Sequence, residues 1–339
     1  MAAKLRIGVT GMVHDHLWGT LGHAAERDDV ELVAAADPNQ PLRDKIAEEY
    51  GVESLYSDYH DLLEKEKPDA VFVYTDNRGG ADVVEACAEA GVHAMVEKPM
   101  ADRLANADRM LSAAEKSGII LMINYPSTWS PGIQHAYKLV EEGAIGQVAQ
   151  LRMRCAHQGP KELGCSEYFY GWLYDPERNG AGALMDYCCY GCKVARWFLG
   201  TPNSVVATWG RLCKDYIDVE DNAFILMDYD RAIGIAEASW TQIGKVPERG
   251  PTFNGCAGTM IVRGDEVWLA TTDDPEGTTI AAPDPPDHWR DPVAHFVWCL
   301  KNEKEPQGPS SAQICRDAQE ILEAGILSCE QGRQIDLPL

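Results

Sequence analysis

The sequence predicts an α/β protein: an N-terminal doubly wound parallel sheet of the Rossmann type, and a C-terminal α+β domain with a large, mainly antiparallel open sheet. Three observations support this prediction. Short apolar runs alternate with helical stretches in the first third of the chain, as in βαβ units. Longer strand-like runs joined by tight turns follow, and these are typical of antiparallel sheets. The chain has 339 residues, which is enough for two domains.

The first third predicts parallel strands because its apolar runs alternate with helical stretches. The expected strands are Leu5–Thr10, Glu31–Asp37, Ala70–Tyr74, His93–Val96 and Ile119–Asn124. Helices are expected between them, such as Ala81–Ala90 and Leu104–Lys116. Pro126 and Pro131 bracket a linker, so we expect the two domains at residues 1–125 and 126–339.

The pattern changes after a helix expected near Ile133–Glu142. Longer strands are then expected at Gln147–Ala156, Ser204–Cys213, Ala223–Asp228 and Ala232–Trp240. A further hairpin is expected over Met260–Ala270, with its turn at Gly264 and Asp265. Three helices are expected among and after these strands, at Gly182–Leu199, Pro292–Lys301 and Ala312–Cys329.

Charge and composition exclude several kinds of partner. The formal net charge is −23 and the isoelectric point is about 4.7, so the surface repels nucleic-acid phosphates and anionic membranes. No stretch approaches the length of a membrane span, and the first apolar run is too short for a signal peptide. The 11 scattered cysteines indicate a reduced, cytoplasmic protein. The Cys189–Cys192 spacing indicates helix packing rather than a metal site.

A dinucleotide site is expected at the end of the first strand. Gly8 and Gly11 lie there, although the turn keeps only the first glycine of the Gly-x-Gly-x-x-Gly pattern. Asp37 ends the second strand where a carboxylate binds both ribose hydroxyls, and it would repel the 2′-phosphate of NADP. NAD is therefore the expected cofactor. His14 and His16 could bind a metal or contact the pyrophosphate, but they are expected to be polar turn residues, and no metal is expected.

Several motifs together carry a family resemblance. Glu97-Lys98-Pro99 follows the fourth strand, Thr75-Asp76-Asn77 follows the third, and Gly143–Gly146 precedes the first long strand. With the run from Ala88 to Pro99, these motifs resemble the glucose–fructose oxidoreductase/inositol dehydrogenase (Gfo/Idh/MocA) family over almost the whole chain. The resemblance implies an NAD-binding Rossmann domain, a sheet domain that binds a sugar-like substrate, and a cis peptide bond before Pro99.

Other positions depart from the family pattern. Many members carry Asp-x-x-x-His on the catalytic helix, whereas Tyr190 follows Asp186 here, as in the aldose dehydrogenase-like branch. Lys193 replaces a further aspartate, and Gly80 replaces a common histidine. Inositol dehydrogenase activity is therefore not expected.

The catalytic residues are expected at the end of a strand of the first domain and on the helix that begins at Gly182. Lys98 lies at the carboxyl end of a parallel strand, where such sheets bind ligands, and partial burial beside the nicotinamide would lower its pKa. Asp186 and Tyr190 are spaced i, i+4 and are expected to share one helix face. Lys98 would then act as a base or polarise the substrate oxygen, Tyr190 would relay the proton, and Asp186 would orient Lys98.

Two larger sets of binding residues complete the expected site. The first set surrounds the cofactor: Gly8, Gly11, Met12, Val13, His14, Asp37, Thr75, Asp76, Asn77, Glu97 and Lys98. The second set binds the substrate and includes aromatic residues of the 157–174 loop: Lys98, Trp129, His157, Tyr170, Trp172, Asp186 and Tyr190.

The expected activity is NAD-dependent dehydrogenation of a sugar, glycoside or polyol. Two alternatives stay open: a redox-neutral glycosidase or lyase that oxidises a hydroxyl only transiently, and a sugar sensor without catalysis. The expected partner is a small carbohydrate or polyol. A homodimer or homotetramer is also expected, because Val205, Phe224 and Ile235 are apolar positions on strands whose second face has no covering helix.

Overall fold

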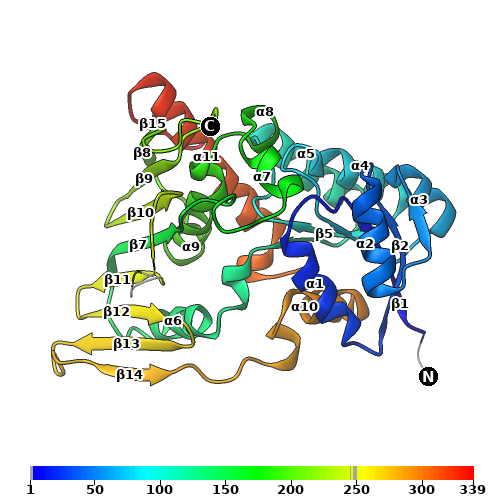
Figure 1. The fold of residues 1–339 in the computed structure, drawn as a ribbon. Coiled ribbons are helices and arrows are strands. Elements are labelled where there is room, and N and C mark those ends of the chain that lie inside the picture. Colours follow the sequence, from blue (N-terminus) through cyan, green and yellow to red (C-terminus); the bar gives the residue numbers. More distant parts are fainter. Residues whose placement is uncertain (1–2, 245, 247–249) are drawn as a thin grey trace.

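The N-terminal half of the computed structural model is a six-stranded parallel sheet (Figure 1). The structure describes residues 3–244, 246 and 250–339. The strand order is β3-β2-β1-β4-β5-β6, and the order reverses between β1 and β4, where a parallel sheet opens its ligand crevice. The strands are β1 (Leu5–Thr10), β2 (Val30–Ala36), β3 (Ser54–Tyr56), β4 (Ala70–Val73), β5 (His93–Glu97) and β6 (Leu121–Asn124).

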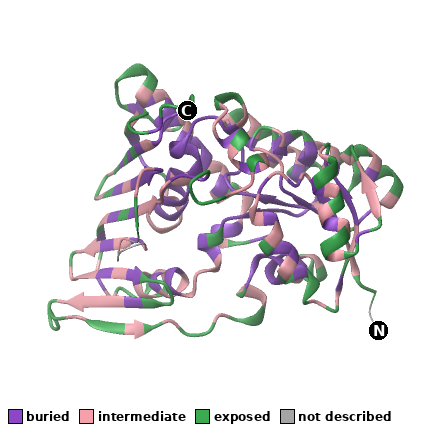
Figure 2. Ribbon diagram, viewed as in Figure 1, coloured by how far each residue is buried: buried purple, intermediate pink, exposed green. Residues whose placement is uncertain are grey.

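Five helices connect these strands, so the doubly wound Rossmann prediction is confirmed. They are α1 (His16–Ala25), α2 (Gln40–Tyr50), α3 (Tyr59–Glu66), α4 (Gly80–Ala90) and α5 (Leu104–Ser117). Buried residues follow the Rossmann strands and the helices beside the second sheet (Figure 2).

The second half contains a nine-stranded sheet of order β14-β13-β12-β11-β7-β10-β9-β8-β15. Its pairs are antiparallel apart from β7 with β10, which are parallel. The strands are β7 (Val148–Ala156), β8 (Ser204–Gly210), β9 (Asn222–Tyr229), β10 (Ala232–Ser239), β11 (Thr252–Gly255), β12 (Gly258–Arg263), β13 (Glu266–Thr271), β14 (Thr278–Ala281) and β15 (Ile335–Asp336). The mainly antiparallel prediction is therefore confirmed, including the hairpin of β12 and β13.

Helices cover one face of this sheet. α9 packs on β7 and β10, α11 packs on β8 and on α9, and α6 packs on β12 and β13. The helical segments of this half are η1 (Pro126–Trp129), α6 (Pro131–Glu141), α7 (Glu167–Leu173), α8 (Pro176–Asn179), η2 (Leu184–Cys188), α9 (Cys189–Leu199), η3 (Asp287–Trp289), α10 (Pro292–Asn302), η4 (Gly308–Ser310) and α11 (Ala312–Gln331). No helix of the described chain combines the length and apolarity that a membrane span needs.

One helix returns to the nucleotide half. α10 packs beside α1, although the two helices are far apart in the sequence (Figure 1). Its Val293 and Phe296 are buried in the same apolar cluster as Ile7 and Phe72 of the Rossmann strands. The nucleotide half is thus completed by a segment from the C-terminal part of the chain.

The helix expected over Gly182–Leu199 begins with a π-helical turn, η2, before regular α9. The Glu220 carboxylate accepts hydrogen bonds from the backbone N–H groups of Gly182 (2.7 Å) and Leu184 (2.8 Å). A Cβ at Gly182 would lie 2.2 Å from the Glu220 carbonyl oxygen, so only glycine fits this approach. Burial raises the pKa of Glu220 to about 7, although these backbone bonds oppose the rise.

The strand expected over Ser204–Cys213 ends earlier, at Gly210. Asp221 explains the difference, because its carboxylate accepts 2.8 Å hydrogen bonds from the backbone N–H groups of Leu212, Cys213 and Lys214. Those donors are therefore unavailable to a sheet partner, and the chain turns away.

The other face of the second sheet carries apolar side chains that no helix of the described residues covers. Val206, Phe224, Leu226 and Ile233 are exposed there. Val205, which was expected on this face, is instead buried under the helices, because neighbouring residues of a strand point to opposite faces.

Candidate active site

The centre of the site is a buried ion pair between the two halves. Lys98 directly follows β5, and its Nζ lies 2.7 Å from Oδ1 of Asp186, which lies on η2. The exposed fractions of Lys98 and Asp186 are 1% and 5%. Oδ2 of Asp186 accepts a hydrogen bond from Nε1 of Trp240 (3.2 Å), a partner that the sequence did not indicate. The Lys98–Pro99 bond is cis, as expected.

The ion pair corrects one expectation about Lys98. Burial favours its neutral form, but the Asp186 carboxylate outweighs burial and raises the pKa of Lys98 above its ordinary value. Burial acts on Asp186 in the opposite sense, and the charge of Lys98 holds the pKa of Asp186 below its ordinary value. Both groups are charged before a ligand enters, so Lys98 is a hydrogen-bond donor rather than a free base.

Tyr190 lies against the same amine. Its ring centroid is 5.0 Å from Nζ of Lys98, and Tyr125 packs edge-on at 5.9 Å between ring centroids. Asp186 lies in the π-helical turn and Tyr190 in the first turn of α9, so their spacing is not a regular i, i+4 pair, yet both converge on Lys98. Burial raises the pKa of Tyr190, so its hydroxyl stays protonated.

One turn further along α9 lies Lys193, which has no exposed surface. Its Nζ donates to Oγ1 of Thr128 (3.0 Å) and lies 5.3 Å from the centroid of the Tyr125 ring. Burial lowers the pKa of Lys193 to about 8. The position that departs from the family pattern is thus a buried amine beside the catalytic candidates.

The turn after β1 has the geometry that a dinucleotide requires. Gly11 has φ +70°, and a Cβ there would lie 2.7 Å from the backbone nitrogen of Thr75, so no larger residue fits. Asp37 accepts hydrogen bonds from the backbone N–H groups of Met12 (2.6 Å) and Asn39 (2.7 Å), which fixes the carboxylate beside the turn. Gly8 lies within β1 and packs against Leu62, so it shapes the strand rather than the turn.

The side chains of Asp76 and Asn77 were expected to contact the cofactor, but they bond to residues of α8. Oδ2 of Asp76 accepts from Nε of Arg178 (2.6 Å), and Nδ2 of Asn77 donates to Oδ1 of Asn179 (2.8 Å). Both side chains therefore hold α8 against the nucleotide half. Thr75 lies next to them, beneath Gly11.

The expected aromatic loop contains α7, which docks on the nucleotide turn. The Asp15 carboxylate accepts from Oγ (2.6 Å) and from the backbone N–H (2.7 Å) of Ser166, which precedes α7. Nε1 of Trp172 donates to the Val13 carbonyl (3.5 Å), and Trp172 is 1% exposed. This corrects the expectation for Trp172, whose enclosed ring supports the turn and leaves no face for a sugar.

Three other residues were predicted to bind the substrate, namely His157, Tyr170 and Trp129, and each has different surroundings. His157 directly follows β7, its ring is 4.7 Å from that of Tyr187, and its Nδ1 accepts from the backbone N–H of Gly159 (2.8 Å). Burial lowers the pKa of His157, which keeps the ring neutral. Tyr170 is half-buried on α7. Nε1 of Trp129 donates to Oδ1 of Asn124 (2.8 Å).

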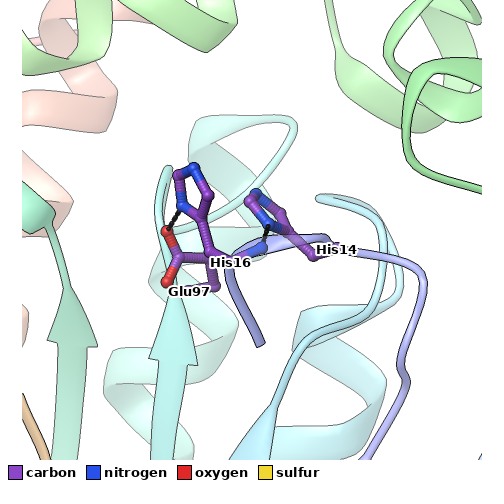
Figure 3. A group of neighbouring side chains, drawn as sticks. All are labelled: His14, His16 and Glu97. Carbon is purple, nitrogen blue, oxygen red and sulfur yellow. Dashed lines mark hydrogen bonds and ion pairs between the residues drawn. The ribbon is translucent and has the colours of Figure 1, made fainter. Parts of the chain in front are cut away.

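A further cluster joins His14, His16 and Glu97 (Figure 3). Nδ1 of His16 lies 2.8 Å from Oε1 of Glu97, and Oε2 of Glu97 accepts from Nδ2 of Asn124 (2.7 Å). His14 is 1% exposed, and burial, together with the charges of His16 and Lys98, holds its pKa well below the ordinary value. The sequence did not indicate that Glu97 would meet the two histidines.

The fold and this geometry define a class of protein: a two-domain, dinucleotide-dependent oxidoreductase with its reactive groups at the junction of the halves. Family comparison gives the particular group. The model of the "Oxidoreductase family, NAD-binding Rossmann fold" matches residues 5–125, and the GFO/IDH/MocA C-terminal domain matches residues 133–268. The chain belongs to the GFO/IDH/MocA oxidoreductase family, as the sequence motifs indicated.

Individual relatives agree with this assignment. D-apiose dehydrogenase of Paraburkholderia graminis is 28% identical over 99% of this chain and 89% of its own. An Agrobacterium radiobacter oxidoreductase in complex with NAD⁺, L-tartaric acid and magnesium superposes with a TM-score of 0.84, at 22% identity and 98% coverage of both chains. Levoglucosan dehydrogenase with NADH and levoglucosan also gives 0.84, at 21% identity over 99% of this chain and 100% of its own.

Proposed function

We propose that this protein transfers hydride between NAD and a hydroxyl-bearing carbon of a sugar, glycoside or polyol. The observation that carries the proposal is the buried Lys98–Asp186 pair at the carboxyl end of β5, beside a turn shaped for a dinucleotide. The relatives named above, which act on D-apiose and levoglucosan, support a carbohydrate substrate.

The cofactor fits the residues present. Gly11 leaves its turn clear of side-chain atoms, and Asp37 is fixed where the ribose hydroxyls of NAD would bind. NAD supplies the hydride acceptor when it is bound. The remaining chemistry falls to the protein, which must hold the substrate oxygen and take up one proton when an alcohol becomes a carbonyl.

Lys98 and Asp186 can do this as a unit. The charged Nζ of Lys98 donates a hydrogen bond to the substrate oxygen and stabilises the negative charge that develops there. As the hydroxyl proton leaves, Lys98 can pass its own proton to Asp186 along their 2.7 Å contact, so the pair gains one proton in total. Tyr190, against the same amine, positions the hydroxyl and relays the proton.

A paired assay tests the proposal. The protein is incubated with NAD and a panel of aldoses, polyols and glycosides, while NADH absorbance and the products are recorded together. We expect NADH to form in equal amount to a ketone or lactone. Release of an aglycone without net NADH would favour the redox-neutral reaction, and neither signal with any substrate would contradict both.

The domain boundaries, the oligomeric state and the cellular location belong to the same proposal. We place the nucleotide domain at residues 1–125 and the substrate domain at 126–339, with α10 contributed by the second to the first. The exposed side chains of Val206, Phe224, Leu226 and Ile233 on the second sheet support a homodimer or homotetramer. All 11 cysteines are free, which fits the reducing cytoplasm.

A further inference from the structure

The turn after β1 and the end of β5 bring three potential metal ligands together. One ligand atom each from His14, His16 and Glu97 lies within 4.8 Å of the others (Figure 3). Glu97 is 81 positions from His16, and the parallel sheet places the carboxyl ends of β1 and β5 at the same edge. Two imidazoles and one carboxylate form the protein ligand set of several catalytic zinc sites, where a fourth position stays open.

We propose that His14, His16 and Glu97 bind a divalent transition-metal ion, for which Zn²⁺ is the best match, with one coordination position left for a substrate oxygen. Glu97, one of the three ligands, ends β5 and directly precedes Lys98 in the chain. The role of the ion rests on the proposed dehydrogenase function, whereas its binding does not.

His14 provides the second observation. Nε2 of His14 is buried and has no hydrogen-bond partner among the described residues. A buried polar nitrogen without a partner is unusual and calls for a missing water or ion. Zinc bonds to nitrogen and oxygen are about 2.0–2.2 Å long, so one small ion can reach three ligand atoms that lie within 4.8 Å of one another.

Hydrogen bonds fix the orientation of the Glu97 carboxylate, as is common for metal ligands. Its Oε2 accepts a hydrogen bond from Asn124, which in turn accepts one from Trp129, so the carboxylate has a fixed orientation.

The open side of the cluster is the side of His16, whose side chain is 39% exposed, whereas that of Glu97 is 2% exposed. A substrate hydroxyl bound there would be polarised by the ion and by Lys98 together, and both would stabilise its oxygen as the proton leaves.

Metal titration tests the proposal directly. The full-length protein is stripped with a chelator, dialysed and titrated with Co²⁺ alone, whose visible absorption reports tetrahedral coordination, and with Zn²⁺ by calorimetry. We expect one ion per chain. His14→Ala, His16→Ala and Glu97→Gln should each weaken binding by more than about 100-fold, because even the loss of a residue that only hydrogen-bonds to a metal ligand typically costs about 10–100-fold.

His60→Ala is the matched control. His60 Nδ1 lies 2.9 Å from Oδ1 of Asp58 in an exposed pair on α3, and no third ligand joins that pair among the described residues. The control should bind Co²⁺ like the unmodified protein. Circular dichroism and the urea midpoint of unfolding show whether each variant is folded, and binding of NADH is measured separately by fluorescence.

Two results would overturn the proposal: no tetrahedral Co²⁺ signal in the unmodified protein, or a signal that survives all three substitutions. If the substitutions weaken NADH binding but Co²⁺ does not bind, the cluster serves only the nucleotide. Failure of the dehydrogenase function has a different signature, namely tight metal binding without oxidation of any carbohydrate.

Discussion

Nζ of Lys98 and Oδ1 of Asp186 lie 2.7 Å apart across the junction between the Rossmann half and the sheet half, and both side chains are nearly enclosed. Neither half contains the pair by itself. The reactive group of this oxidoreductase is therefore assembled only when β5 and η2 meet.

The loss of Lys98 and the loss of Asp186 should affect turnover in different ways. Lys98→Ala should abolish most turnover, while NAD binding survives because Gly11 and Asp37 are unchanged. Asp186→Asn should move the basic limb of the pH profile of kcat/KM to lower pH, because the neutral amide no longer raises the pKa of Lys98 and the charged donor is lost sooner. Steady-state kinetics across pH measure both effects. Near-normal kcat in Lys98→Ala would refute the assignment.

Tyr190→Phe isolates the contribution of one hydroxyl. A positioned acid–base group contributes about 10²–10⁴-fold, so kcat should fall by that order while the KM of the substrate changes less. Tyr229→Phe, a half-buried position on β9, serves as the control. Equal kcat values for Tyr190→Phe and the unmodified protein would assign Tyr190 a structural role.

Asp37 should set the choice between NAD and NADP. We expect the unmodified protein to prefer NAD, because the carboxylate repels the 2′-phosphate. Asp37→Ala should lower the ratio of kcat/KM for NAD to that for NADP by at least about tenfold, whereas Asp44→Ala, an exposed acid on α2, should not. A native preference for NADP would contradict the role of Asp37.

Lys193 should make stability depend on pH. Burial lowers its pKa from 10.5 to about 8. Below pH 8 the Lys193 amine is charged in both the folded and the unfolded chain, so folding carries the full free-energy cost of burying that charge. Between pH 8 and 10.5 the unfolded chain binds more protons, so the free energy of unfolding rises with pH. Lys193→Met should therefore stabilise the protein at pH 7 by on the order of 2 kcal/mol.

Urea unfolding of both proteins at pH 7 and pH 10 measures this difference. The advantage of the methionine variant should shrink at pH 10. A variant that is less stable at pH 7 would show that the bond to Thr128 and the aromatic contacts outweigh the cost of burial.

The exposed apolar face of the second sheet should mediate assembly. Leu226→Lys puts a charge at the centre of that face and should shift the protein toward the monomer, as read by small-angle scattering or ultracentrifugation. Leu212→Lys, exposed on the loop after β8, should leave the mass unchanged. A monomeric unmodified protein would contradict the proposal.

Much of the fold follows from local patterns in the sequence. β1, β2, β4, β5 and β6 were predicted because each is a short apolar run that alternates with a helix. β3 was missed, since three residues are too few to show a period. α7 was also missed: its residues are mostly aromatic, and only the capping hydroxyl of Ser166 marks its start.

The sequence predicts which residues form the site, but it does not predict the contacts between them. The motifs singled out Lys98, Asp186 and Tyr190, and the structure brings the three together. The bond from Trp240 to Asp186 joins residues 54 positions apart and depends on the packing of β10 against η2. No local pattern reports such a contact, and the same holds for Glu97 beside His16.

The return of α10 to the nucleotide half has a consequence for synthesis on the ribosome. Phe72 is covered by Phe296, which emerges long after the last Rossmann strand. Until then the nascent nucleotide half exposes an apolar surface, so it must stay loosely packed or protected by a chaperone. A fragment that stops at Tyr125 would carry that surface permanently, and it should aggregate when it is expressed alone.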